Sequence, residues 1–276
     1  MPGVLYIVAT PIGNLEDLTF RALRILKEVD LIAAEDTRHS RRLLDHYGIK
    51  TPLTSYHEHN EQSKARHLVE RMQRGESIAL ISDAGTPVLS DPGHRLVQEA
   101  IRAGISISPL PGPSALIAAL SASGLSMEPF AFEGFLPAKR KERREKLQSL
   151  RAEARTLVFY EAPHRLKESL EDISAIFGNR EMVLAREISK VHEEFLRGSA
   201  IDLIAKLADR DVRGELTLVI AGAAAEPAAA EDIMAEIRKL KGHGIRVKEI
   251  AALLGEKYSV AKREVYRMVL ELDESE

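Results

Sequence analysis

An apolar strand runs directly into a loop of turn-forming residues in the stretch Ala79-Leu80-Ile81-Ser82-Asp83-Ala84-Gly85-Thr86-Pro87-Val88-Leu89-Ser90-Asp91-Pro92-Gly93. The loop contains two Asp, two Gly and two Pro, which is more turn chemistry than a simple connection needs. Open α/β sheets bind ligands in the crevice beyond the carboxyl ends of their strands. The stretch therefore predicts a parallel α/β sheet with a ligand site at this loop, and an ordinary strand-to-helix turn is the alternative.

Strand and helix patterns alternate on both sides of this stretch. Short apolar runs predict strands over 4–9, 31–34, 52–56, 77–81 and 105–110, and periodic apolar positions predict helices over 16–28, 39–47, 61–74, 94–103 and 115–123. This alternation is typical of a right-handed, doubly wound parallel sheet. The glycine fingerprint of dinucleotide folds and the phosphate-cradling P-loop motif are both missing, so we expect neither NAD nor ATP chemistry.

Composition narrows the class of protein further. The chain has 276 residues, of which 45% are hydrophobic and 29% charged, and no run approaches the ~20 apolar residues of a membrane span. It contains no Cys, so disulfides, thiolate catalysis and Cys-based zinc sites are excluded, and we expect no metal site. No signal peptide is evident, which favours the cytoplasm and no contact with membranes. A net charge of −3 leaves only local patches for nucleic-acid binding.

The remainder of the chain predicts two further parts. Strands over 156–160, 182–185 and 216–220, with helices over 163–176 and 199–209, indicate a second α/β domain. A Gly/Ala/Pro linker then leads to three short helices over 233–240, 247–254 and 260–272, which resemble a helix-turn-helix module. Such a module serves either as a packing or dimerisation appendage or as a nucleic-acid-binding unit. We therefore divide the chain into 1–119, 120–224 and a helical tail module at 231–276.

A basic segment separates the two α/β parts. Over 137–151 seven basic residues oppose two acidic ones. One interpretation is a solvated helix face with mixed charges. The other is a mobile patch beside the cleft that tracks phosphates, through Lys139, Arg140, Arg143 and Arg144.

Motifs at successive strand ends are similar to those of the tetrapyrrole (corrin/porphyrin) methylase superfamily, and in particular of its ribosomal-RNA branch. The resemblance covers about residues 3–222 and is carried by 6–15, 34–38, 82–87, 109–115, 133–137 and 159–166. It implies two α/β domains, the first with a parallel and the second with a mixed sheet, in a homodimeric enzyme that uses S-adenosylmethionine. For that branch it implies methylation of a cytidine ribose 2′-hydroxyl in small-subunit ribosomal RNA.

The resemblance also implies which residues hold the cofactor. The first turn would shape the floor of the cleft, the loop after Ile81 would hold the methionine portion, and the second domain would close over the adenosine. This chain has Ser82-Asp83-Ala84-Gly85 where relatives have a Gly-Asp-Pro-like sequence. The implied cofactor residues are Pro11, Ile12, Gly13, Asp83, Ala84, Gly85, Ser114, Ala115, Tyr160, Glu161, Leu166, Glu215 and Leu216.

A ribose hydroxyl is a poor nucleophile while protonated, so a base, or a cation that stabilises the developing alkoxide, would assist methyl transfer. Glu161, His164 and Asp36 are the candidate catalytic residues, with Arg38, Arg186 and Lys190 as further candidates for this task, because each is expected just beyond a strand end. The sequence leaves open which of them is the base, since a lone His is more often a surface or capping residue. Arg38, Arg165, Arg186 and Lys190 are further candidates to hold RNA phosphates, with structural ion pairs as the alternative.

Three functions remain open on this evidence. The first is a methyltransferase acting on small-subunit ribosomal RNA, recognised largely by its shape and backbone. The second is a methyltransferase acting on a small tetrapyrrole, and the third is a non-catalytic RNA-binding protein. The basic 137–151 segment and the helical tail favour the larger anionic substrate.

Overall fold

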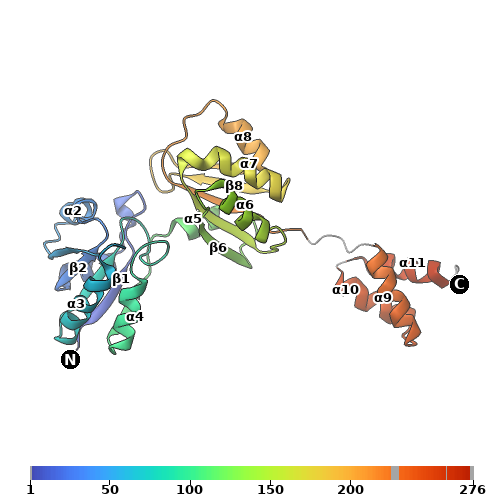
Figure 1. The fold of residues 1–276 in the computed structure, drawn as a ribbon, viewed down its shortest axis with the longest axis horizontal. Helices are drawn as coiled ribbons and strands as arrows, with labels where there is room; N and C mark the ends of the chain where they lie inside the picture. The colour runs from blue at the N-terminus through green and yellow to red at the C-terminus, as the bar shows by residue number, and fades with distance from the viewer. Residues whose placement is uncertain (1, 225–229, 259, 274–276) are drawn as a thin grey trace. The chain divides into compact units, whose positions relative to one another are not determined.

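The computed structural model describes residues 2–224, 230–258 and 260–273. It forms two compact units, residues 1–222 and 223–276 (Figure 1). Within the described residues, no helix is both long and apolar enough to cross a membrane.

The first sheet is parallel and has the strand order β3-β2-β4-β1-β5. Its strands are β1 (Val4–Val8), β2 (Leu31–Ala34), β3 (Leu53–Ser55), β4 (Ile78–Ile81) and β5 (Ser106–Leu110). β2 and β4 are buried along their whole lengths, as expected for central strands covered on both faces. The predicted parallel sheet is confirmed.

Two helices cover each face of this sheet. Helices α1 (Phe20–Glu28) and α2 (Thr37–His46) share one apolar core with Val8 and Ile81, whereas α3 (Glu61–Gln73) and α4 (His94–Arg102) share another with Leu5 and Leu80. Alternate residues of β1 and β4 thus face opposite cores, which makes the sheet doubly wound. The helix expected from residue 16 begins at Phe20, because the Thr19 hydroxyl accepts a hydrogen bond from the Ala22 N–H at 3.1 Å, and a short 3-10 turn, η1 (Leu15–Asp17), precedes it.

The second sheet is mixed and has the strand order β6-β7-β10-β8-β9. Its strands are β6 (Phe130–Phe135), β7 (Thr156–Glu161), β8 (Met182–Arg186), β9 (Glu194–Gly198) and β10 (Leu216–Ile220). Only β6 and β7 pair in parallel. The sequence analysis missed β6 and β9, because both are half-buried edge strands that lack a continuous apolar run.

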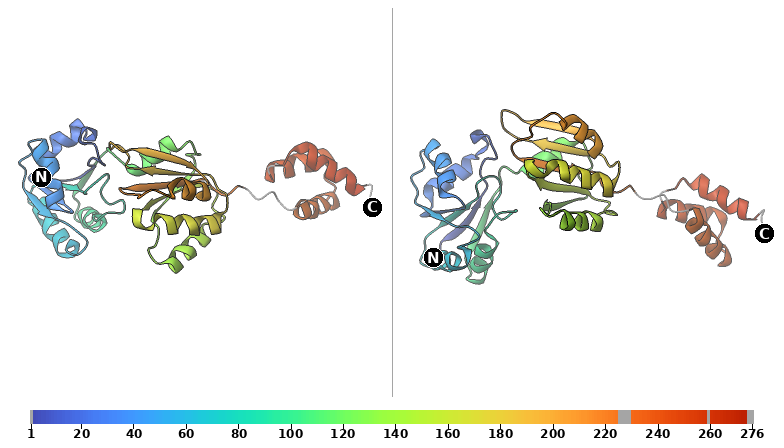
Figure 2. Two further views of the ribbon diagram at one scale, coloured as in Figure 1. Left: turned by 90° about the horizontal axis from the view of Figure 1, so that it is seen from above. Right: turned by 45° about the horizontal axis from the view of Figure 1, so that its top comes forward.

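Helix α5 (Ala115–Ser123) follows the last strand of the first sheet but packs on the second, where Leu116 and Leu120 meet Val158 and Val219. The expected domain boundary after residue 119 lies within this helix. Helices α6 (Arg140–Ser149), α7 (Leu166–Phe177) and α8 (Ala200–Leu207) cover the opposite face, and the short turn η2 (Pro163–Arg165) leads into α7. Figure 2, left, shows the green α5 and the yellow-green helices on opposite sides of the sheet.

The basic segment forms a regular helix, α6, rather than a mobile strip. The Arg143 side chain is fully buried, and its Nε donates to Asp172 Oδ2 at 2.9 Å while its Nη2 pairs with Glu168 at 3.2 Å. Burial alone would raise the pKa of Asp172, but hydrogen bonds from Arg144 and Arg143 hold this pKa below its usual value. A fully buried guanidinium cannot reach an RNA phosphate, so the expectation for Arg143 was wrong and this residue docks α6 onto α7.

The second unit contains the three predicted helices, α9 (Ala230–Gly242), α10 (Val247–Lys257) and α11 (Lys262–Asp273). They enclose a core of their own, whose buried members include Ile237, Ile250, Leu254, Val265 and Val269. A separate core indicates that this unit is stabilised by its own packing.

Candidate active site

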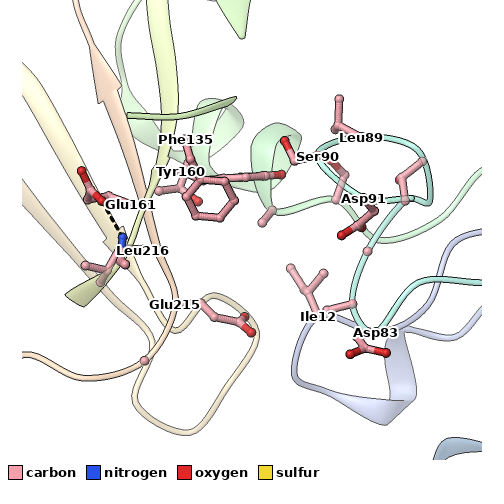
Figure 3. A pocket seen from close by; sticks show the side chains of 18 of the residues that line it. Ile12, Asp83, Leu89, Ser90, Asp91, Phe135, Tyr160, Glu161, Glu215 and Leu216 are labelled. Atoms are coloured by element: carbon pink, nitrogen blue, oxygen red, sulfur yellow. Dashed lines mark hydrogen bonds between the residues drawn. The ribbon is translucent and has the colours of Figure 1, made fainter. Parts of the chain in front are cut away.

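A cavity of about 470 Å³ lies where the carboxyl ends of the first sheet meet β6, β7 and β10 of the second. This volume is typical of small-molecule sites. In Figure 3, Tyr160, Glu161 and Leu216 lie across from Ile12, Asp83 and Asp91. The cavity is lined by Ile12, Glu35, Asp83, Ala84, Gly85, Thr86, Leu89, Ser90, Asp91, Ser114, Ala115, Phe135, Tyr160, Glu161, Ala162, Pro163, Gly214, Glu215, Leu216 and Thr217.

Most of the expected cofactor residues line this cavity. They are Ile12, Asp83, Ala84, Gly85, Ser114, Ala115, Tyr160, Glu161, Glu215 and Leu216. Three do not line it. Leu166 is the first residue of α7 and is buried in the core, Pro11 is buried, and Gly13 lines a neighbouring hollow. The contribution of each of these residues to binding stays a prediction.

The loop after β4 is tied to the segments that follow β1 and β5. Thr10 and Gly85 exchange backbone hydrogen bonds of 2.9 and 3.0 Å, and the Thr86 hydroxyl donates to the Pro113 carbonyl at 3.3 Å. Val88 and Ser90 have φ values of 76° and 63°, a left-handed region that is uncommon for residues other than glycine and especially for a β-branched one. Backbone strain of this kind clusters at ligand sites, where the surrounding contacts hold it in place.

Three carboxylates that follow strands of the first sheet face the cavity, and none of them has a basic partner among the described residues. Burial, together with the negative charges of Asp91, Asp83 and Asp36, raises the pKa of Glu35 to about 7. Burial also raises the pKa of Asp91 to about 6, with Asp83 adding to the effect while a hydrogen bond with Ser82 opposes it. Asp83 is oriented by the Asp36 N–H, which donates to its Oδ1 at 3.1 Å.

The lining as a whole is acidic. Glu161 and Glu215 are paired with Arg165 and Lys190, but no Lys, Arg or His belongs to the described lining itself. A cationic ligand would neutralise the Glu35, Asp83 and Asp91 charges, whereas an anionic one would be repelled.

The opposite wall is aromatic. Tyr160 lies edge-to-face with Phe132 and Phe135, with ring centroids 5.0 and 5.5 Å apart. Burial raises the pKa of Tyr160, so its hydroxyl stays neutral at physiological pH. Together with Leu89 and Leu216, the Tyr160 and Phe135 rings offer an apolar surface to a planar group.

The structure does not bring the three candidate catalytic residues together. Asp36 caps α2, accepting from the Arg38 N–H at 2.8 Å, and hydrogen bonds from Arg38 lower its pKa. His164 is exposed in η2 and does not line the cavity. Glu161 does line it, but its carboxylate already accepts hydrogen bonds from the Ala162 N–H and the Ser169 hydroxyl and pairs with Arg165.

The cations expected to bind RNA lie on several elements. Arg38 is exposed and paired with Asp36, and Arg165 is held by Glu161. Arg186 donates to the Arg213 carbonyl at 2.8 Å and pairs with Glu194. Arg140 and Arg144 lie on α6 and Lys139 directly precedes it, and each of the three pairs with a carboxylate. Lys190 lies at the rim of the cavity beside Glu215.

Half of the residues that line the cavity were not predicted from the sequence. Glu35 directly follows β2, and Asp91 belongs to the loop that follows β4, so their positions at strand ends were available signals. Phe135 was not predicted as a lining residue because the sequence did not reveal the strand that carries it, β6. The other missed residues are Thr86, Leu89, Ser90, Ala162, Pro163, Gly214 and Thr217.

Solved structures with this fold include uroporphyrin-III-C-methyltransferase from Thermus thermophilus, with a TM-score of 0.54 and 23% identity over 79% of this chain and 94% of the other. Cobalt precorrin-4 methyltransferase has a TM-score of 0.60 and 17% identity, with the same coverage. Identities this low establish a shared fold only.

Curated relatives are more similar. Proteins named ribosomal RNA small subunit methyltransferase I from Synechocystis sp. and Pseudomonas aeruginosa are 46% and 50% identical over 275 residues, which is 98% of this chain and 99% and 97% of the relatives. The family described as Tetrapyrrole (Corrin/Porphyrin) Methylases matches residues 4–204. With its parallel and mixed sheets and the cavity between them, the chain belongs to the tetrapyrrole (corrin/porphyrin) methylases.

Proposed function

We propose that this protein transfers a methyl group from S-adenosylmethionine to the ribose 2′-hydroxyl of a cytidine in small-subunit ribosomal RNA. The observation that carries the proposal is near-full-length similarity to relatives named for methylating small-subunit ribosomal RNA, in a chain whose cavity suits a cationic methyl donor. As the resemblance implies, it would act in the cytoplasm as a homodimer.

The lining fits this cofactor by charge and by shape. Glu35, Asp83 and Asp91 offer negative charge to the sulfonium and the ammonium, and the Tyr160 and Phe135 rings offer an apolar wall to the adenine. When bound, the cofactor would supply an electrophilic methyl group to the 2′-oxygen and keep the sulfur as a neutral thioether, and the hydroxyl proton would pass to water.

The chain's own contribution is mainly to hold the reactants in line. Placing nucleophile and electrophile in a near-attack geometry can supply much of the rate acceleration. The strained loop, fixed to β1 through Thr10 and to the turn before α5 through Pro113, provides a rigid wall for this purpose.

The proposal is tested by transfer of labelled methyl groups to small ribosomal subunits from cells that lack this gene. We expect label in a cytidine ribose of the subunit RNA and none in uroporphyrinogen. Label in the pigment alone would favour a tetrapyrrole substrate. Stoichiometric binding of S-adenosylmethionine in calorimetry, lost in Asp83→Ala, would argue against a non-catalytic RNA-binding protein, and unchanged affinity in that variant would exclude Asp83 from the site.

A further inference from the structure

A second hollow, of about 930 Å³, adjoins the cofactor cavity. Its walls are the turn at 13–16, His46 of α2, and the loop 187–192 between β8 and β9. The linings of the two spaces contact each other at Glu215, which lines the cavity and whose backbone N–H donates to Glu187 Oε1 of the hollow at 2.9 Å. We call this contact the junction of the two spaces.

Lys190 stands at this junction in a fixed position. Its Nζ donates to Glu187 Oε1 at 2.8 Å and lies 3.2 Å from Glu215 Oε2, and its side chain is 26% exposed. Its stem crosses Gly13 so closely that a Cβ on that glycine would lie 2.2 Å from Lys190 Cγ. Burial alone would lower the pKa of Lys190, but Glu187 and Glu215 raise it overall, so the group is an ammonium at neutral pH.

The loop that carries Lys190 is held in an unusual conformation. Glu187 and Ser189 both have left-handed φ values, of 53° and 68°. The Ser189 hydroxyl donates to the Asp17 carboxylate, so the loop is tied to the turn opposite. Strain maintained by contacts with a distant segment is typical of a ligand site rather than of a free hairpin.

The hollow suits a neutral group better than a phosphate. Two carboxylates already balance the Lys190 charge, and Glu16 adds a further acid to the lining. An ammonium has three N–H donors, and two of them are directed at Glu187 and Glu215. The third can serve a hydroxyl oxygen and stabilise negative charge as it develops there.

The other residues that could assist the reacting hydroxyl either have partners of their own or lie outside the cavity. Asp36 caps α2, Glu161 is enclosed by its own partners, and His164 is exposed away from the cavity. Arg38 and Arg186 pair with Asp36 and Glu194.

We propose that the hollow is the subsite for the acceptor nucleotide of the RNA, and that Lys190 donates a hydrogen bond to its ribose 2′-oxygen at the junction with the cofactor cavity. This inference rests on the proposed function. Enzymes that modify a nucleotide within folded RNA or DNA take it out of its stack, and an open hollow beside the cofactor can receive it. The exposed side chain of Val191, on the lining loop, offers apolar contact to an unstacked nucleotide.

The test compares Lys190→Met and Lys190→Arg with Lys167→Met, a matched control at an exposed lysine of α7 outside both spaces. S-adenosylmethionine affinity is measured by calorimetry, and methyl transfer to undermethylated subunits is measured under single turnover. We expect Lys190→Met to keep cofactor affinity within about twofold and to lower the transfer rate about 100-fold, the effect of losing one oxyanion donor. Lys190→Arg should recover part of this loss, and the control should match the unaltered protein.

Gly13→Ala provides a second variant that keeps the charge but displaces the lysine stem. It should lower the transfer rate in the same direction as Lys190→Met. A Lys190→Met rate within about threefold of the unaltered protein would overturn the assignment. So would a parallel loss of cofactor affinity and thermal stability in both variants, which would identify Lys190 as a structural tie. Absence of transfer to RNA by the unaltered protein would instead overturn the proposed function, and this inference with it.

Discussion

Glu35 is the cavity residue whose ionisation depends most on the surrounding fold. Its pKa rises from 4.5 to about 7 because it is partly buried near Asp91, Asp83 and Asp36. The folded state therefore holds the proton more tightly than the unfolded chain does. Ionised Glu35 destabilises the fold fully above pH 7, progressively less as the pH falls from 7 to 4.5, and not below that range.

We expect Glu35→Gln to raise the melting temperature at pH 8 and to leave it unchanged at pH 4, where the carboxyl is protonated in both states. The same variant should bind S-adenosylmethionine more weakly at pH 8, because it removes a charge that faces a cationic ligand. In the unaltered protein the affinity should fall as the pH drops from 7.5 to 5.5. Thermal melts and calorimetry test both effects, with Glu171→Gln, at an exposed position of α7, as the control. A melting temperature lowered at pH 8 would contradict this interpretation of Glu35.

At the scale of elements, the docking of α6 on α7 depends on a buried ion pair. The Arg143 and Asp172 side chains are 0% and 1% exposed and lie 2.9 Å apart. Asp172 also pairs with Arg140 and Arg144, so removing Arg143 takes away the buried one of its three cationic partners. The segment with the highest local positive charge is thus anchored by one of its own cations.

We expect Arg143→Met to lower the free energy of unfolding by about 1–3 kcal/mol, measured by urea denaturation, because Asp172 loses a buried hydrogen-bond donor but keeps Arg140 and Arg144. Lys141→Met is the matched control on the same helix, because the Lys141 side chain is 88% exposed. Its effect should stay within about 0.5 kcal/mol. Equal effects of the two substitutions would show that the pair does not dock the helix.

At the scale of the whole molecule, the two units have separate cores and the cavity belongs to the first alone. Every residue that lines the cavity lies between Ile12 and Thr217, whereas the helical tail encloses its own apolar core. Cofactor binding is therefore expected to be independent of the tail.

We expect a chain truncated after residue 222 to bind S-adenosylmethionine with an affinity within about twofold of the full chain, as measured by calorimetry. Ile237→Asp in the full chain should disrupt the tail core and likewise leave this affinity unchanged. Comparing methyl transfer to ribosomal subunits by these two variants then isolates the contribution of the tail. A loss of cofactor affinity on truncation would contradict the separation of the units.

The sequence by itself determined the alternation of strands and helices in the first domain and the loops at which its ligand site forms. Both follow from local patterns, because an apolar run of five residues or a glycine after a helix acts through its immediate neighbours. The stretch 79–93 accordingly predicted β4 and a ligand site in the loop that follows it. The sequence did not predict β6 and β9, because their apolar patterns are weak. These edge strands form by pairing with the strand beside them, which a local pattern does not show.

Only the tertiary structure decided which side chains face the cavity. Glu35 and Asp36 are adjacent in sequence, yet Glu35 lines the cavity and Asp36 caps a helix. Arg143 is a buried ion-pair partner rather than an RNA contact because Asp172 lies on the helix beside it. Lys190 lies at the cavity rim because its ammonium pairs with Glu215 and its stem passes close to Gly13, and both residues are distant in sequence. The physical reason is that the charge and burial of a side chain depend on distant segments, which a local pattern does not record.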